Sequence, residues 1–199
     1  MVLVPHGMKI IEPADTVTDT TIWKLFEQML RNDVEEPMQF ESFMGMLKGW
    51  YISLRDREFE PAQAIVLCGP EDCGKTFVQE FIITPLLGGN EADPFSYLSG
   101  ITAFTGDLFN AEHLRTSDAG GSLNDKERRI EGFWCNPKPA IFSRFPSKPA
   151  FRERIDKAKP SFIRQLLDYP PREDDCSPPD RLLRVPDPGR TLDGNRGRA

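Results

Sequence analysis

The apolar side chains of the first sixty residues recur every three or four positions, which predicts two amphipathic helices. The first covers Thr18 to Asn32 and follows threonine and aspartate side chains that suit a helix N-cap. The second starts at Pro37, a favourable first helical residue, and continues to Leu54. Its apolar face is rich in methionine and aromatic side chains, which is more typical of core packing than of a ligand groove. We therefore expect a helical lead-in over residues 1–60.

A strand and a helix are predicted on either side of a glycine-containing turn. Ala64 to Leu67 is an apolar run that predicts a buried strand, and Lys75 to Leu87 has helical spacing, with Pro85 bending or ending its last turn. Gly88-Gly89-Asn90 closes this unit. Residues 61–135 are thus expected to form an α/β core. Further along, the segments 95–98 and 104–109 are ambiguous. A strand is predicted over Glu112 to Ser117, and a charged helix over Asn124 to Gly132.

Proline shapes the last third of the chain, where residues 133–199 hold 11 of the 18 prolines. Because proline lacks an N–H and clashes inside helices and central strands, we expect little regular structure there. One window, 160–168, keeps an amphipathic pattern and predicts a short helix. Residues 136–199 are therefore predicted to be a Pro- and Arg-rich C-terminal region, mostly disordered from Pro170 onward.

Composition narrows the class of protein. The net charge of −6 is uneven, with 11 basic against 22 acidic side chains in residues 1–132 and 14 against 9 in residues 133–199. A basic tail can contact nucleic acid, although a solvated tail explains the same pattern. No apolar stretch has the length of a membrane span or the pattern of a signal peptide. The four cysteines form no metal-binding pair, so we expect a cytoplasmic protein with reduced thiols.

The turn between the predicted strand and helix matches the phosphate-binding pattern G-x-x-x-x-G-K-[ST] in full. Gly69 and Gly74 would let the backbone wrap so that several N–H groups face one phosphate, at the positive end of the following helix. Lys75 would reach the β- and γ-phosphates, and the Thr76 hydroxyl would hold Mg²⁺. The predicted ATP-binding residues are Gly69, Pro70, Glu71, Asp72, Cys73, Gly74, Lys75 and Thr76.

A nucleotide site of this kind also needs a carboxylate at the end of a neighbouring strand to complete the Mg²⁺ shell. Asp118 is the best candidate, because it follows a predicted strand and precedes a glycine pair. Glu112 and Asp107 are alternatives, and a plain turn residue is the other interpretation of Asp118. The next residue, Ala119, cannot polarise water as a second acid would. The predicted catalytic residues are Lys75 and Asp118, and the predicted Mg²⁺ ligands are Thr76 and Asp118.

Several stretches between Trp23 and Phe133 form a wider pattern: an aromatic helix ending near WYISL, then AIVLCGPEDCGKTFVQEFIITPLLGG, TAFTGDL, AEHLRTSDA and a charged segment with KERR. Together they resemble the helicase domain of virus- and plasmid-type primase–helicases, the superfamily 3 group with an AAA+-like core. Thr105 stands where that family usually has Asn. The segment from Asn136 to Ile155 departs from the family pattern, and AKPSFIRQLLDYP resembles a later part of it.

The resemblance implies an ATPase that couples hydrolysis to movement on single-stranded DNA, typically as a hexameric ring that replicates phage or mobile-element DNA. It places the Mg²⁺ carboxylate at Asp118. It also implies an arginine finger that reaches the neighbouring subunit's nucleotide, for which Arg152 and Arg154 are the candidates. The candidate basic contacts to DNA are Lys126, Arg128 and Arg129.

The sequence therefore predicts an α/β fold of the P-loop NTPase type with an AAA+-like core, serving as the ATP- and Mg²⁺-dependent module of a replicative primase–helicase. Two other hypotheses stay open. The basic region 144–164 could supply the lid of a P-loop phosphotransferase that acts on a small molecule. Ala119 and the irregular segment after residue 136 fit a nucleotide-binding remnant that no longer hydrolyses ATP.

Overall fold

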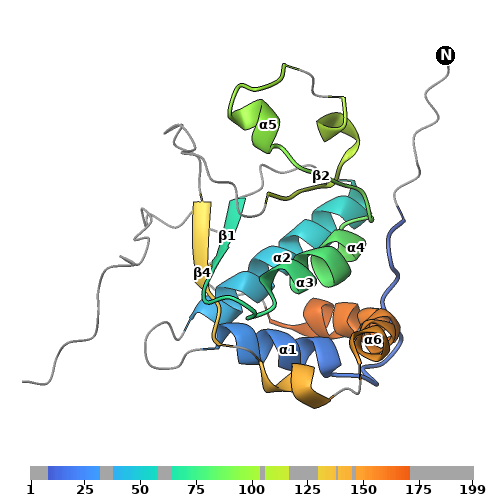
Figure 1. The fold of residues 1–199 in the computed structure, drawn as a ribbon. Coiled ribbons are helices and arrows are strands. Elements are labelled where there is room, and N and C mark those ends of the chain that lie inside the picture. Colours follow the sequence, from blue (N-terminus) through green and yellow to red (C-terminus); the bar gives the residue numbers. More distant parts are fainter. Residues whose placement is uncertain are drawn as a thin grey trace, which may run out of the picture.

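The structure is a computed structural model that describes residues 9–31, 38–57, 64–103, 106–116, 130–137, 139–144 and 147–170. In these ranges the chain forms helices and two small parallel sheets of two strands each (Figure 1). None of the helices in these ranges is long and apolar enough to cross a membrane.

The two predicted N-terminal helices are confirmed, the first with tighter bounds and the second ending two residues later than predicted; its predicted first residue, Pro37, lies outside the described residues. Helix α1 spans Thr21–Leu30 and helix α2 spans Gln39–Asp56. The backbone N–H of Thr21 donates to Asp19 Oδ1 at 2.8 Å, which satisfies one of the free donors at the start of α1. Both helices bury their apolar stripes, so their methionine and aromatic side chains serve core packing, as the pattern predicted.

The first sheet pairs strand β1 (Ala64–Cys68) with strand β4 (Ile130–Trp134) in parallel. Strand β1 is confirmed as a strand, but the burial expected for it is wrong: Ile65 and Leu67 are half-buried against the core, and Val66, on the other face, is 44% exposed. The charged helix predicted over Asn124 to Gly132 is wrong at its C-terminal end, because Ile130 already belongs to β4. Pairing with β1 supplies backbone partners from Ile130 onward, and Phe133 is buried at 2% exposure. This tertiary pairing outweighs the local pattern.

The predicted helix after the glycine-containing turn is confirmed as one continuous run. It consists of α3 (Lys75–Val78), a π-helical turn η1 (Gln79–Ile83) and α4 (Thr84–Leu86). Pro85 lies in α4, the last turn of the run, which ends one residue later at Leu86, as predicted. π-Turns inside α-helices are rare and frequently mark functional regions.

A second, shorter sheet follows the run 75–86. Strand β2 (Glu91–Ala92) pairs in parallel with β3 (His113–Leu114), which is much shorter than the strand predicted over Glu112 to Ser117. The described residues of the connecting segment include helix α5 (Phe95–Leu98) and the 3₁₀ turn η2 (Leu108–Asn110). The ambiguous segment 95–98 is thus helical. In Figure 1 this connection projects from the top of the molecule.

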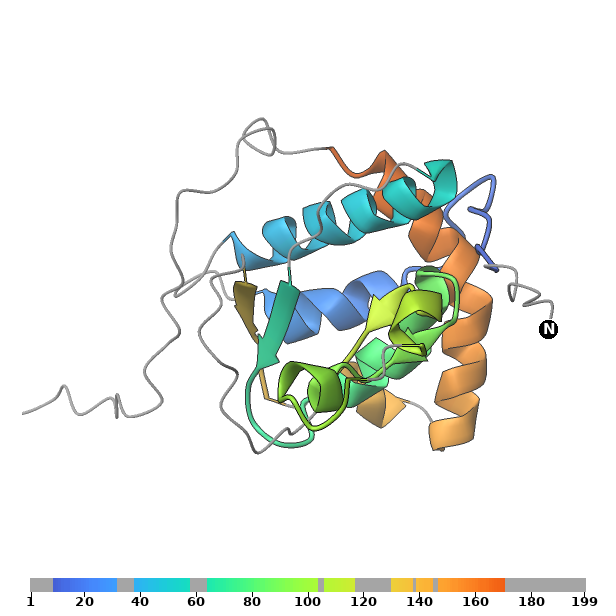
Figure 2. The ribbon, with the colours of Figure 1, turned by 90° about the horizontal axis from the view of Figure 1, so that it is seen from above.

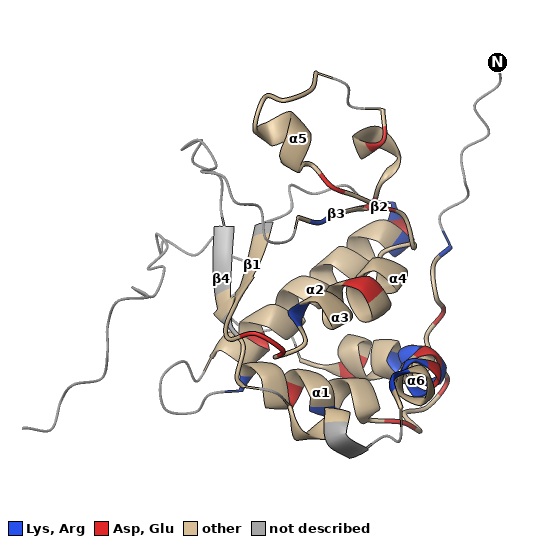
Figure 3. Ribbon diagram, viewed as in Figure 1, with Lys and Arg blue, Asp and Glu red and all other residues tan. Residues whose placement is uncertain are grey.

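The C-terminal helix is much longer than predicted. After the 3₁₀ turn η3 (Ala140–Arg144), helix α6 spans Lys148–Asp168, whereas a short helix near 160–168 was expected. Pro149 sits in the first turn, where no N–H is needed, and the Ser147 hydroxyl accepts from the N–H of Ala150 at 3.3 Å. Pro160 is tolerated inside the helix. Acidic and basic residues lie close together along α6 (Figure 3).

One hydrophobic cluster joins α1, α2, the helical run 75–86, β4 and α6, whereas, among the described residues, none of its members comes from the second sheet or its connection. Helix α6 packs against α1, α2 and η1, and side chains from β4 and the helical run 75–86 complete the cluster (Figure 2). Its aromatic centre is the ring of Phe26, which lies 5.2 Å from the ring of Phe43 and 5.5 Å from the ring of Phe162. The lead-in, the α/β part and the C-terminal helix therefore share one core. The tail from residue 171 onward lies outside the described residues.

Candidate functional site

The octet 69–76 forms a compact bend between β1 and α3. The backbone turns through positive φ angles at three positions: Gly69 at 141°, Asp72 at 58° and Gly74 at 97°. Glycine adopts such angles without steric cost, and aspartate tolerates the left-handed region better than most residues. Glycine occupies the two positions, 69 and 74, whose φ angles lie farthest from the ordinary left-handed region. The bend therefore has the strand–turn–helix context that the motif requires.

Both glycines are also needed because neighbouring elements lie against the bend. A Cβ added at Gly69 would lie 2.6 Å from the backbone oxygen of Cys135, just after β4. A Cβ added at Gly74 would lie 2.6 Å from Cζ of Phe142 in η3. No side chain could be added at either position without displacing the backbone or an aromatic ring. Cys135 and Phe142 thus pack against the octet and support its shape.

The N–H groups of the bend are available to a ligand. Among the described residues, no backbone N–H from Glu71 to Phe77 donates a hydrogen bond to a protein atom, and the first internal bond of the helix runs from Val78 to the oxygen of Gly74 at 3.0 Å. Buried or half-buried backbone donors without partners are rare in folded proteins unless water or a ligand satisfies them. A row of such donors at a helix N-terminus suits a phosphate group.

The Lys75 side chain folds back over the bend. Its ammonium nitrogen donates to the backbone oxygens of Gly69 at 2.9 Å and Pro70 at 2.8 Å. The third contact, with Cys73 Sγ at 3.4 Å, is long and involves a weak acceptor. Two of the three ammonium protons therefore hold the cation at the rim of the octet. The third N–H group makes the weakest hydrogen bond, so it can most easily turn to a stronger acceptor such as a phosphate oxygen.

The side chains of the other octet residues differ in how exposed they are. Thr76 is exposed, so its hydroxyl can meet a ligand from solvent, and Glu71 and Asp72 also face solvent. Cys73 is fully buried, which agrees with a structural role for this small residue. Burial, together with the neighbouring Cys73 thiol, raises the pKa of the Cys135 thiol to about 12, so that Cys135 stays protonated at neutral pH.

Several of the other predicted site residues lie outside the described residues. Asp118 lies outside the described residues, as do Lys126, Arg128 and Arg129. Among the described residues, no group of three or more histidine, cysteine, aspartate or glutamate side chains is arranged to hold a metal ion. The alternative carboxylate Asp107 is exposed and lies next to η2. The Mg²⁺ ligand set beyond Thr76 therefore stays a prediction.

Glu112, the second alternative carboxylate, is partly buried. Its Oε1 accepts from Asn90 Nδ2 at 3.4 Å, and its Oε2 is buried without a hydrogen-bond partner in the described part of the chain. A hydrogen bond of that length is weak, so most of the acceptor capacity of this carboxyl group is unused.

The two candidate arginine fingers are engaged by their own chain. The Arg152 guanidinium carbon lies 4.1 Å from the ring centre of Phe81, and Arg154 forms an ion pair with Asp19 at 3.0 Å. A cavity of about 250 Å³ lies beside this ion pair, and no octet residue lines it. The role of these arginines toward a neighbouring subunit stays a prediction.

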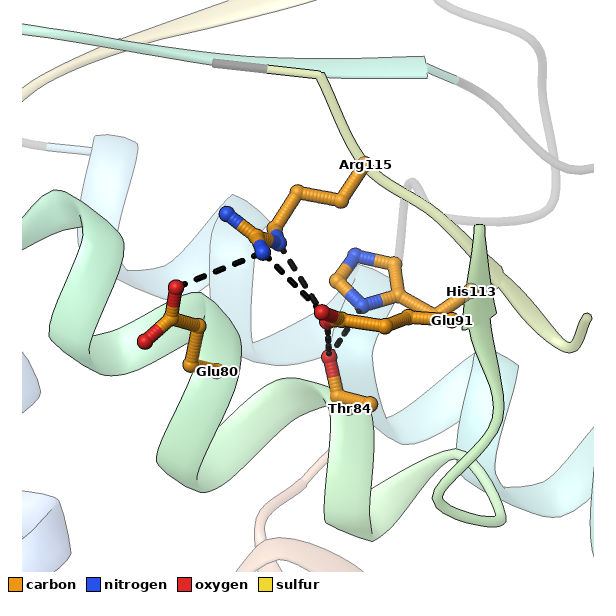
Figure 4. Close-up of polar contacts among 5 residues, drawn as sticks. All are labelled: Glu80, Thr84, Glu91, His113 and Arg115. Atoms are coloured by element: carbon orange, nitrogen blue, oxygen red, sulfur yellow. Dashed lines mark hydrogen bonds and ion pairs between the residues drawn. The ribbon is translucent and has the colours of Figure 1, made fainter. Parts of the chain in front are cut away.

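Sequence reasoning missed a polar cluster at the far end of the run 75–86 (Figure 4). Thr84 Oγ1 donates to Glu91 Oε2 at 2.8 Å and contacts His113 Nδ1 at 2.7 Å. A carboxylate can only accept a hydrogen bond, so the Thr84 hydroxyl donates to Glu91. The same hydroxyl oxygen then accepts a hydrogen bond from the Nδ1–H of His113. Arg115 holds both Glu91 oxygens, at 3.2 and 3.0 Å, and also pairs with Glu80 at 3.3 Å.

The electrostatics of this polar cluster follow from its burial. Burial lowers the pKa of His113, against the opposing effect of Glu91, so that the imidazole is neutral at pH 7. The hydrogen bonds from Arg115 lower the pKa of the Glu91 carboxyl, which stays ionised. No local signal could have revealed the cluster, because its members come from η1, α4, β2 and the β3 region. It ties the helix that begins at Lys75 to the second sheet.

Comparison of the chain with protein-family models, with curated proteins and with solved structures gave no match.

Proposed function

We propose that the chain is a P-loop NTPase module that binds ATP and Mg²⁺ at the octet 69–76. One observation supports this proposal above the others. The backbone N–H groups from 71 to 77 have no protein acceptor among the described residues, and the Lys75 ammonium group is held beside them. Free amide donors and a cation at the start of a helix are what a triphosphate needs for binding.

The residues of the octet would divide the work. The N–H groups would hold the β-phosphate. The Lys75 ammonium group would exchange its long hydrogen bond to Cys73 Sγ for one to an oxygen of the β- or γ-phosphate. The exposed Thr76 hydroxyl would offer one oxygen to Mg²⁺, with Asp118 as the proposed second ligand. When bound, Mg²⁺ would neutralise the negative charge that develops on the phosphate oxygens during transfer of the γ-phosphoryl group. The two glycines contribute the backbone shape that brings these groups together.

We further propose that the module belongs to a cytoplasmic replicative primase–helicase with an AAA+-like core, acting on single-stranded DNA as a ring of identical subunits. The support is the resemblance of the stretches between Trp23 and Phe133 to that class. Arg152 and Arg154, on the exposed side of α6, are the proposed trans-acting arginines. Each would first leave its present partner, Phe81 or Asp19.

The experiment measures ATP binding and phosphate release, with and without single-stranded DNA, for the wild type and Lys75→Ala. Hydrogen bonds to charged groups contribute about 1.5–3 kcal/mol, so Lys75→Ala should weaken ATP binding by about 10- to 100-fold. Lys157→Ala is the matched control, because that lysine is exposed and its ion-pair partner among the described residues is Glu153 on its own helix. Equal ATP binding by all three proteins, or none by any of them, contradicts the proposal.

A nucleotide-binding remnant is the second candidate, and the ties of Arg152 and Arg154 within their own chain favour it. A remnant would be stabilised by ATP against heat without releasing phosphate. Phosphate release that DNA stimulates would support the helicase instead. Turnover only in the presence of a small-molecule acceptor would indicate a phosphotransferase.

A further inference from the structure

The connection between β2 and β3 carries several of the large apolar side chains that the structure leaves exposed. Four of them define what we call the α5–η2 surface: Tyr97, Leu98, Ile101 and Phe109, which are 48%, 53%, 73% and 85% exposed. Single exposed apolar residues are normal on protein surfaces, but apolar side chains that gather on one projecting segment often mark an interaction site.

This segment is held in place by its own hydrogen bonds. The N–H of Thr102 donates to the oxygen of Ser96 at 3.1 Å, and Asn110 Nδ2 donates to the oxygen of Gly106 at 3.1 Å. At its base, the N–H of Arg115 donates to the oxygen of Ala92 at 2.9 Å, next to the Thr84–Glu91–His113–Arg115 cluster. Local hydrogen bonds therefore hold the residues around α5 and those around η2, and the base of the connection is fixed by the second sheet.

Charge limits what can cover the α5–η2 surface. Between residues 91 and 114 the chain has no lysine or arginine, and its four charged residues are all acidic (Figure 3). Arg115 pairs with Glu91, and Glu112 is partly buried, so the exposed carboxylates without an ion pair in the described part of the chain are those of Asp93 and Asp107. Nucleic acids and anionic lipid surfaces carry the same sign of charge and would be repelled. A second copy docked through the same face would also bring like charges together. A basic partner remains.

We propose that the α5–η2 surface is a docking site for a protein segment that presents large apolar side chains flanked by lysine or arginine. Ile101 and Phe109, the most exposed of the four, would be covered by the partner's apolar side chains. Asp93 and Asp107 would attract its basic residues. The proposal does not depend on nucleotide binding at the octet.

The test selects peptides from a random display library on the immobilised full chain. Peptides with apolar residues and lysine or arginine should be enriched, and their binding should weaken as salt increases. The double variant Ile101→Ser/Phe109→Ser should bind them at least about tenfold more weakly, as expected for the loss of central apolar anchors. The matched control, Val17→Ser/Met38→Ser, removes two apolar side chains exposed elsewhere and should bind as the wild type does.

Several results would overturn this proposal. They are no enrichment, enrichment of acidic or uncharged peptides, or equal losses in the two double variants. Self-association of the wild type that only Ile101→Ser/Phe109→Ser removes would assign the surface to a second copy. Binding to neutral phosphatidylcholine vesicles that the same variant removes would assign it to a membrane. Far-UV circular dichroism checks that both variants are folded, which is expected because the replaced side chains face solvent.

Discussion

At the scale of single residues, the candidate site depends on backbone angles more than on side chains. Gly69 and Gly74 adopt positive φ, and both lie against atoms that leave no room for a Cβ. The same two residues are the fixed glycines of the phosphate-binding motif, so packing and ligand binding require the same choice. Lys75 then needs only to fold back to reach the oxygens of Gly69 and Pro70.

Replacing Gly74 by alanine should destabilise the protein. A Cβ there meets Phe142 at 2.6 Å and forces an L residue to φ 97°, so we expect the free energy of unfolding to fall by about 1–3 kcal/mol. Gly49→Ala is the matched control, because Gly49 is in the middle of α2 with nothing within 4 Å. That change should raise the free energy of unfolding by about 0.5–1 kcal/mol. Urea unfolding measures both, and changes of equal sign would contradict the expectation.

At the scale of elements, the polar cluster around His113 makes stability depend on pH. Because burial lowers its pKa in the folded state, His113 binds a proton more readily when unfolded. The stabilising effect of the neutral imidazole is therefore complete above about pH 6.5, the ordinary value, and is lost as pH falls below it.

The free energy of unfolding of the wild type should accordingly decrease between pH 7.5 and 5.5. His113→Gln keeps a polar side chain without a titrating ring and should show a smaller decrease over that range. Glu91, whose pKa is lowered, affects stability only at more acidic pH, below its ordinary value of 4.5. Urea titrations at a series of pH values provide the measurement. Parallel pH dependences for the two proteins would show that His113 does not control the effect.

Elements differed in how well the sequence predicted them, for physical reasons. Helices α1 and α2 follow from local spacing, because each buries one clear apolar face, and strand β1 follows from its short apolar run. Strand β4 does not, since its partner β1 lies far away in the sequence. Helix α6 was missed over its first half because Pro149 and Pro160 suggested breaks that its buried face overrides. The octet was predictable from its motif, whereas the His113 cluster has no local signature.

At the scale of the whole molecule, one core includes the lead-in, the helical run from Lys75 and the C-terminal helix. Phe162 of α6 illustrates this arrangement, because its ring lies near those of Trp23 and Phe26 in α1. Regions distant in the sequence therefore depend on each other for burial. We expect the described part of the chain to unfold as a single cooperative unit.

Phe162→Ala should lower the free energy of unfolding by about 3–5 kcal/mol, because the side chain is fully buried. Phe109→Ala is the matched control: its ring is 85% exposed, and a change within about 0.5 kcal/mol is expected. Tryptophan fluorescence and far-UV circular dichroism should report one coincident transition in the wild type. Two separate transitions would mean that the three regions fold independently.

The support of the octet by Cys135 and Phe142 has a consequence for how the protein is made. During translation, residues 69–76 leave the ribosome well before the segment that packs behind them. Until β4 and η3 have emerged, the bend lacks the support of Cys135 and Phe142. If the octet binds phosphate as proposed, a nascent chain should acquire that affinity late in synthesis, when β4 has paired with β1.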